Sequence, residues 1–311
     1  MTAAAQITNP AQESSRAGKD VKQAITDRII GMLERGEVDS TVRVSDRFCK
    51  NAFSFLSKVS AYPTNAKTEA RYNGINFLLL TMTTMDEGYS TNKWLTFKQA
   101  SELGGKVRKG ERGTQGVYYS KHSSMKENET GETEEISYSF LKGFYLFNLD
   151  QIDGLDHLRE VKGARDSVSS NAAIDSFIAS TGAEIKHGTH VQPCYIPSAD
   201  YISMPHQDIF ATDEDYYATT LHELSHWTGH DSRMAREFGK RFKDHAYAVE
   251  ELTAELCAAM LCGRFQIIDA TVHSHVSYLA SWLEALREDN GVIFAAASAA
   301  SKAFDYLIPQ H

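Results

Sequence analysis

Residues 222–226 read His222-Glu223-Leu224-Ser225-His226, and this stretch decides the class of the C-terminal half of the chain. Thr212, with Asp215 three residues later, can cap a helix that carries the motif, and Gly229 can end it. Residues four apart lie on one face of a helix, so both imidazoles can bind one divalent metal ion at about 2.0–2.1 Å. Glu223 then lies beside the metal without binding it, which is the position of a general base.

A catalytic zinc site needs a third protein ligand. The segment Val249–Leu256 is a strong helix former that looks buried, yet it carries three carboxylates, and such a helix needs a reason to hold them. We predict that Glu251 is the third ligand and that Glu255, four residues on, orients a ligating histidine. Glu250 is the alternative ligand. His230 is disfavoured, because it follows the glycine that ends the helix. The predicted cofactor is Zn²⁺, with Mn²⁺ or another divalent metal as the alternative.

The composition is that of an ordinary globular protein. The chain has 311 residues, of which 42 % are hydrophobic and 23 % charged, and this excludes fibrous and wholly disordered classes. The net charge of −9 hides an uneven distribution. Residues 41–126 carry 14 Lys/Arg and 6 Asp/Glu, a net +8, whereas residues 127–311 carry 13 and 29, a net −16. A basic half is therefore joined to an acidic half.

The four cysteines form no CxxC pair, so neither a disulfide framework nor a thiolate zinc site is indicated. The N-terminus lacks the apolar stretch of a signal peptide, and no apolar run reaches the roughly 18 residues of a membrane span. We therefore expect a cytoplasmic protein without a membrane partner. The sequence leaves the oligomeric state open.

The pattern of elements predicts an α+β fold with two domains. Asp20 can cap an amphipathic helix that Gly36 ends, and residues 96–103 form a second, short helix. Strands at 116–120 and 138–149 flank the acidic stretch 126–137, which we expect to be the tip of a long hairpin. A helix at 171–180 is followed by a strand-like region at 190–204, and the rest of the sequence is mostly helical. The predicted boundaries are a disordered tail at 1–19, a small mixed α/β domain at 20–158, a linker at 159–170 and a mostly helical domain at 171–311.

Aromatic and basic residues alternate between Tyr62 and Lys121. Such mixtures bind single-stranded nucleic acid, because cations neutralise phosphates while rings stack on unpaired bases. No base-reading motif is evident, so binding without sequence specificity is predicted. The opposing interpretation is that the rings are core and the basic segment docks on the acidic half. The candidate DNA contacts are Arg71, Tyr72, Lys93, Trp94, Lys98, Lys106, Arg108, Lys109 and Arg112.

Several segments of the chain match those of one known family. They are Asn65 with 71–76 (RYNGIN), 94–100 (WLTFKQA), 103–111 (LGGKVRKGE), 147–148 (FN), 150–155 (DQIDGL), 202–205 (ISMP), 222–230 (HELSHWTGH) and 250–255 (EELTAE). On these segments the chain resembles the ArdC-type antirestriction family of plasmids and phages, whose N-terminal domain also occurs on conjugative-plasmid primases. The resemblance implies a single-stranded DNA-binding domain at 20–158, a zincin-like metallopeptidase domain at 171–311 and a role in protecting mobile DNA from restriction. Zincins usually place an edge strand that pairs with an extended peptide where this chain has residues 200–205.

Three functional hypotheses follow. The first is an antirestriction protein of a mobile element that binds single-stranded DNA and holds Zn²⁺ through His222, His226 and Glu251, with Glu223 as base. The second is an intracellular zinc endopeptidase that its N-terminal domain recruits to DNA or to a protein substrate, which the sequence does not name. The third is a DNA-binding protein that the metal stabilises without catalysis.

Overall fold

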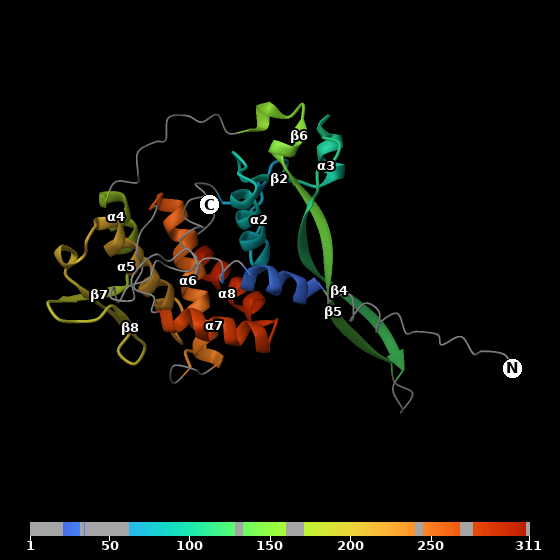
Figure 1. Cartoon of the computed structure of the whole chain (residues 1–311). Coiled ribbons are helices and arrows are strands. Elements are labelled where there is room, and N and C mark those ends of the chain that lie inside the picture. Colours follow the sequence, from blue (N-terminus) through green and yellow to red (C-terminus); the bar gives the residue numbers. More distant parts are fainter. Residues whose placement is uncertain are drawn as a thin grey trace.

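The computed structural model describes residues 21–31, 34, 62–127, 133–159, 171–239, 245–267 and 276–308. The predicted tail, the helix stop at Gly36 and residues 160–170 of the predicted linker lie outside these ranges. Within them, the predicted α+β class and the two-part organisation are confirmed (Figure 1). Residues 21–31 are helical, as the apolar spacing predicted, and bury Ile25 and Ile29.

The N-terminal part is built on a four-stranded sheet in the order β1-β2-β5-β4, with the helix α2 packed against β4. The short helix α3 begins at Thr96, whose hydroxyl accepts the N–H of Gln99 in a capping box. A separate pair of strands, β3 and β6, lies beside it. The bounds are β1 Thr64–Asn65, α2 Ile75–Asp86, β2 Lys93–Leu95, α3 Phe97–Glu102, β3 Lys106–Val107, β4 Thr114–Glu127, β5 Thr133–Asn148, η2 Leu149–Gln151, β6 Ile152–Asp153 and η3 Asp156–Leu158.

The hairpin of β4 and β5 is longer than the sequence predicted. Pairing runs from Thr114 opposite Leu146 to Glu127 opposite Thr133, so strands continue into the acidic stretch that was expected to be only a tip. In Figure 1 this hairpin extends away from the helices as a twisted ribbon.

The C-terminal part combines a three-stranded sheet with five helices among its described residues. The helix α4 covers the predicted range, and α5 carries the histidine motif. No helix of the described residues is both long and apolar enough to cross a membrane. The bounds are α4 Asn171–Ser180, β7 Glu184–Gly188, β8 Cys194–Ile196, β9 Tyr201–Pro205, η4 Gln207–Ile209, α5 Asp213–Trp227, α6 His245–Phe265, α7 Val276–Glu288 and α8 Val292–Leu307.

The expectation that residues 200–205 form an edge strand is wrong. The sheet order is β7-β9-β8, so β9 is the middle strand, parallel to β7 and antiparallel to β8. The missed strand is β7, whose sequence Glu-Ile-Lys-His-Gly carries one large apolar residue and gives no clear strand signal. Pairing with β7 closes one side of β9, and β8 becomes the edge strand beside α5.

A single apolar core joins the two parts. Helix α2 packs on α8, and the Gly74 N–H donates to Ser301 Oγ at 2.7 Å. The ring of Tyr62 lies between Phe77 and Phe304, with centroid distances of 4.8 and 5.4 Å. The main cluster of buried residues draws on the helical segment 21–31, α2, the hairpin and the C-terminal helices alike. The N-terminal sheet is thus fixed to the helices that carry the histidine motif.

Candidate functional site

The helix α5 starts and stops where its sequence signals lie. Thr212 Oγ1 accepts the N–H of Asp215 at 3.1 Å, and three acidic residues in the first turn face the positive end of the helix dipole. Leu221 and Leu224 are fully buried and hold the helix against the core. This packing places His222 and His226 one turn apart with their ring centroids 4.8 Å from each other. Both histidines are buried, as a preformed metal site requires.

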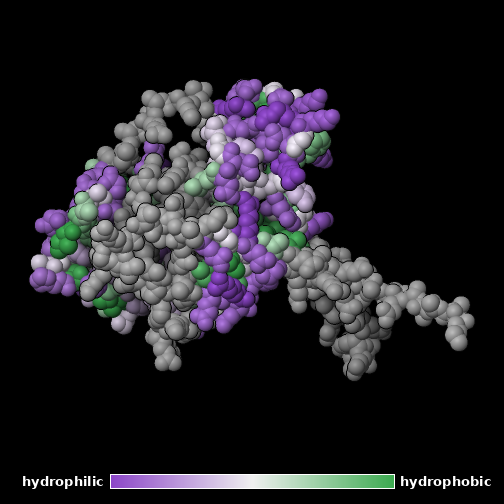
Figure 2. Space-filling model, viewed as in Figure 1, coloured by the Kyte–Doolittle hydropathy of each residue, from purple (hydrophilic) through white to green (hydrophobic). Residues whose placement is uncertain are grey.

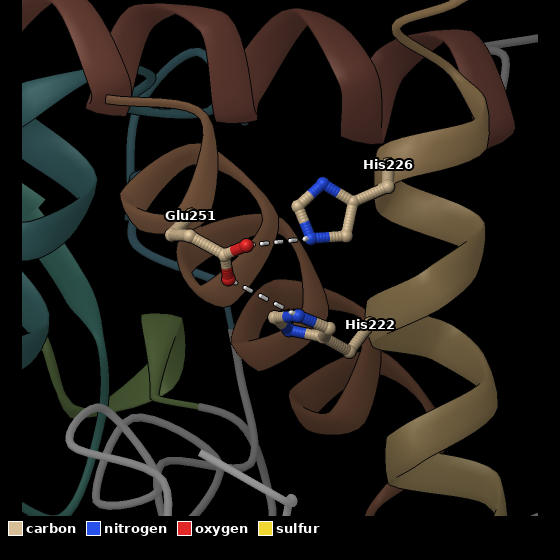
Figure 3. Close-up of side chains that lie close together, drawn as sticks. All are labelled: His222, His226 and Glu251. Atoms are coloured by element: carbon tan, nitrogen blue, oxygen red, sulfur yellow. Dashed lines mark ion pairs between the residues drawn. The ribbon is translucent and has the colours of Figure 1, made fainter. Parts of the chain in front are cut away.

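Helix α6 brings Glu251 to the two imidazoles (Figure 3). Its Oε2 lies 3.8 Å from His222 Nε2, and its Oε1 lies 3.7 Å from His226 Nε2. One donor atom from each of the three residues falls within 4.8 Å of the others. Two atoms that share one ion at about 2.0–2.2 Å can stand up to about 4 Å apart. The two carboxylate distances already lie within this limit, so the donor set fits a divalent metal once the pair that is furthest apart closes by less than about 1 Å. The three residues are the predicted ligands, and Zn²⁺ and Mn²⁺ both suit two imidazoles and a carboxylate.

Glu250 contacts the Nδ1 side of His226 and not the side that faces Glu251. His226 Nδ1 donates to Glu250 Oε1 at 3.0 Å, which leaves Nε2 of the same ring facing Glu251. Glu250 is therefore placed to orient a ligating histidine, and Glu251 rather than Glu250 faces Nε2. Glu255 Oε2 lies 3.8 Å from His222 Nδ1, which is longer than a hydrogen bond, and the orienting role of Glu255 stays a prediction.

Arg236 holds Glu250 in place, and nothing in the sequence pattern pointed to it. Its Nε and Nη2 donate to the two carboxylate oxygens of Glu250, each at 2.8 Å. The guanidinium also donates to Thr228 Oγ1 at 2.7 Å and to the Ser225 carbonyl at 2.8 Å. Arg236 lies in the irregular segment after α5, so the arginine ties that segment to both helices of the site.

The charges of the cluster set its protonation. Burial alone would lower the pKa of His226, but the carboxylates of Glu251 and Glu250 raise it well above its usual value. Burial and the charge of His226 lower the pKa of His222 to about 4. Burial would raise the pKa of Glu251, but the opposite charge of His226 outweighs it and lowers that pKa to about 2. At neutral pH the metal-free cluster thus holds one charged and one neutral imidazole.

Glu223 is held at the edge of the sheet. Its Oε2 accepts the backbone N–H of Tyr195 in β8 at 2.7 Å. Burial raises the pKa of Glu223 to about 7, against the lowering effect of His226. A carboxyl with that pKa can both take and return a proton near neutral pH. The Tyr195 hydroxyl donates to Asp200, which also pairs with Arg233, so the strand that contacts Glu223 is anchored on its other side.

Of the other polar residues near the motif, Tyr247 hydrogen-bonds Glu251 through its side chain. His230 lies off the face of α5, and its Nδ1 is 2.8 Å from Ser232 Oγ, which agrees with its exclusion as a ligand. His273 and His275 lie outside the described residues.

Four candidate DNA contacts are engaged within the fold. The indole of Trp94 is fully buried and donates to Asn92 Oδ1 at 2.7 Å. It has no free face on which a base could stack. Arg71 pairs with Asp305 at 3.3 Å and lies over the ring of Phe304, on the C-terminal part. The Tyr72 hydroxyl accepts from Asn65 at 2.9 Å. Lys93, with a side chain only 16 % exposed, lies 3.8 Å from Glu69. The sequence pattern mixed these core and bridging residues with surface ones.

The other five basic candidates are exposed. They are Lys98, Lys106, Arg108, Lys109 and Arg112. Arg108 pairs with Glu111 at 2.7 Å, and Lys98 lies 3.9 Å from Glu102. All five lie on α3, β3 or the segment that leads into β4, so the structure gathers them in one region of the N-terminal part.

The two parts of the chain match two known protein families. Residues 19–147 match the family described as the N-terminal domain of anti-restriction factor ArdC, and residues 172–299 match the zincin-like metallopeptidase family. The crystal structure of the antirestriction protein ArdC from plasmid R388, in its metal-free form, superposes with a TM-score of 0.73 at 38 % identity, over 93 % of this chain and 96 % of that one. The chain belongs to the ArdC family. The Mn(II)-bound structure of the same protein matches with a TM-score of 0.68 at 35 % identity over 92 % of this chain and 96 % of that one.

Two other proteins are similar in sequence to this ArdC-family chain. It is 32 % identical to the protein y4eC of Sinorhizobium fredii over 94 % of its own length and 92 % of that protein. It is also 36 % identical to the DNA primase TraC of Escherichia coli, over 80 % of its own length but only 24 % of the primase. The chain therefore spans about a quarter of the length of that relative. A divalent metal is supported by the zincin-like match and by the Mn(II)-bound relative.

Proposed function

We propose that this chain is an antirestriction protein of a mobile genetic element that binds single-stranded DNA without sequence specificity and carries a zincin-like metal centre. The observation that carries the proposal is the convergence of His222, His226 and Glu251 from two helices on one point. Five exposed cations in one region of the N-terminal part support the DNA-binding half of it. The protein would act in the cytoplasm, where incoming DNA meets restriction enzymes.

The residues around the centre suit hydrolysis of a peptide bond. A divalent ion at this position supplies Lewis acidity toward a carbonyl and lowers the pKa of water. Glu223, next to the two histidines, is the residue that would take the proton of the attacking water and return it to the leaving amine. The Tyr195 N–H keeps the carboxylate pointed in one direction, and Glu250 keeps His226 in the tautomer that offers Nε2.

The experiment that tests the proposal is fluorescence anisotropy with a labelled strand of about 20 nucleotides, longer than the roughly 4–16 nucleotides of a single compact binding site. The single strand and its duplex are titrated with the wild type and with Glu223→Gln, and bound metal is quantified on the same samples. We expect a preference for the single strand and near-stoichiometric metal in both proteins. No binding at moderate salt would refute the DNA-binding half, and absence of metal after gentle purification would refute the metal centre.

The second candidate is an endopeptidase whose N-terminal part only recruits it to DNA or to a protein. The edge strand β8 favours this candidate, because Tyr195 contacts Glu223 at the side of the sheet that no other strand covers in the described residues. A cavity of about 610 Å³ adjoins the start of β8 and is lined mainly by apolar residues such as Pro193, Ile209 and Phe210. Under this candidate Glu223→Gln abolishes protection and leaves DNA affinity intact. If the metal only stabilises the fold, Glu223→Gln changes neither the protection from restriction nor the DNA affinity.

A further inference from the structure

Two aromatic side chains of the N-terminal part are unusually exposed. Phe97, at the start of α3, and Tyr145, in β5, each show 61 % of their surface to solvent. Phe147 lies between them. It shares one face of β5 with Tyr145, since alternate residues of a strand point the same way, and its ring centroid is 6.3 Å from that of Phe97. Phe147 is half-buried against the small core around Leu95, whereas Phe97 and Tyr145 are exposed. We call these three residues the aromatic strip.

Small residues keep this strip open. A Cβ atom at Gly113 would come within 3.1 Å of Phe147 Cζ and of Tyr145 Cβ, so the backbone of β4's lead-in lies directly against the two rings. Gly143 precedes Tyr145 by two residues on the same face of β5 and adds no side chain there. Scattered single exposed hydrophobic residues are ordinary, but two exposed rings linked by a half-buried third ring and bordered by glycine indicate a binding surface.

Buried residues lie on both faces of these strands. On the face of Tyr145 and Phe147, Leu95 stands opposite Phe147 and is buried in a second small core. Farther along the same face, Val117 and Leu141 are buried in the main core. On the opposite face, Leu146 and Trp94 are fully buried and form a small core with Leu80 of α2. Phe97 and Tyr145 nevertheless keep 61 % of their surface exposed.

Positive charge borders the strip on both sides. Lys98 follows Phe97 in α3, and its side chain is 89 % exposed. Arg112 precedes Gly113, is exposed, and forms no ion pair with the described part of the chain. Figure 2 shows a small hydrophobic patch beside the position of α3, surrounded by hydrophilic surface. Flat rings between cations complement a strand whose bases are unpaired and whose backbone is anionic.

We propose that Phe97, Tyr145 and Phe147 are the stacking platform for the bases of single-stranded DNA, with Lys98 and Arg112 at the phosphates. The inference rests on the proposed function and deepens it by naming the surface. A duplex is a poor ligand for such a platform, because its bases are already stacked on each other. The aromatic contacts take no account of base identity, since every base has a π-face, so binding is tolerant of sequence.

The test compares single substitutions of the full chain in the anisotropy assay. Phe97→Ala and Tyr145→Ala each weaken binding of the single strand by about 5- to 150-fold, the range for loss of one stacked base. Tyr145→Phe restores binding, because it keeps the ring. The matched control is Tyr118→Ala. Tyr118 is 44 % exposed on the same hairpin, but it stands opposite Lys142 in the register and so points to the other face of the sheet. Its loss leaves affinity within about twofold of the wild type.

Salt dependence separates the two kinds of contact. The alanine variants of the rings keep the wild-type slope of log affinity against log salt concentration. Lys98→Ala and Arg112→Ala each flatten it by about 0.7, the value for one phosphate contact on a single strand. If the wild type binds no single strand, the proposed function fails and the platform with it. If the wild type binds but Phe97→Ala and Tyr145→Ala bind equally well, the platform alone is refuted. Loss of protection in cells by these variants with unchanged DNA affinity would also refute it, and would assign the strip to a protein partner.

Discussion

Replacement of Arg236 by methionine tests the assignment of Glu250 as the buried residue that orients His226. Methionine keeps most of the length of the side chain and removes its charge and its donors. In the protein Glu250 is 3 % exposed and accepts two hydrogen bonds from Arg236 and one from His226. Without the guanidinium, the buried carboxylate of Glu250 loses two charged hydrogen bonds and keeps only His226 as a charged partner.

The magnitude follows from that burial. Removal of one partner of a buried ion pair costs about 3–5 kcal/mol, because the remaining charge stays desolvated. The Ser225 carbonyl and Thr228 Oγ1 also lose a donor. We expect Arg236→Met to lower the free energy of unfolding of the metal-free protein by about 3–5 kcal/mol, measured by urea denaturation with a chelator present. Glu250→Gln in the same background should recover at least about 1 kcal/mol relative to additivity, since it removes the stranded charge.

The matched control is Arg28→Met. Arg28 pairs with Asp86 at 3.4 Å on the surface, where the two side chains are 37 % and 46 % exposed. Such exposed pairs contribute about 0–1 kcal/mol. If Arg236→Met costs no more than Arg28→Met, the buried pair does not support the site, and the account of Glu250 is wrong.

Three further predictions concern the metal cluster. Because His226 is charged and His222 neutral in the metal-free protein, Zn²⁺ binding at pH 7 should release about one proton, seen by calorimetry in buffers of different ionisation enthalpy; release of none would contradict these protonation states. Metal should raise the Tm of the wild type and of Glu223→Gln, but not of His222→Ala, which lacks a ligand. The raised pKa of Glu223 means that its protonated form is favoured by the fold, so this contribution is present below about pH 4.5 and is lost as pH rises through about 7. Glu223→Gln should therefore stabilise the metal-free protein at pH 8 by about 3 kcal/mol in urea denaturation, and a destabilised variant would refute the assigned shift.

The three candidate metal ligands, which the structure brings together, could be named from the sequence because local rules place them. Helical spacing sets His222 and His226 on one face of their helix. Carboxylates are rarely buried without a partner, so their presence on a helix with apolar residues on all sides indicates a functional role. The choice among those carboxylates was harder. Glu250 and Glu251 are neighbours in sequence but point about 100° apart on the helix, and which of them meets Nε2 depends on how α6 crosses α5. Arg236, which neutralises Glu250, lies in an irregular segment whose path no periodicity describes.

For the candidate DNA contacts, the sequence predicted the region but not which side chains are exposed. Composition identified a region rich in rings and cations, but alternation along the chain does not tell an exposed ring from a buried one. Trp94 and Tyr145 lie on opposite faces of the same sheet, and the faces were assigned only by the register of β2 on β5. The edge position expected for residues 200–205 failed for a related reason, since β7 pairs with β9 through a sequence with little strand character.

The shared core fixes the N-terminal and C-terminal parts to each other. Arg71 pairs with Asp305 and lies over Phe304, and the Gly74 N–H donates to Ser301, all across the boundary between the two parts. Separation of the parts would expose the apolar side of α8, which also packs on the helix that carries Glu251. The parts are therefore expected to unfold together rather than as independent units. A substitution of Phe97 or Tyr145 leaves this core untouched, whereas truncation would disturb the proposed metal centre as well as the proposed DNA surface. Only point substitutions in the full chain can therefore separate the two proposed functions.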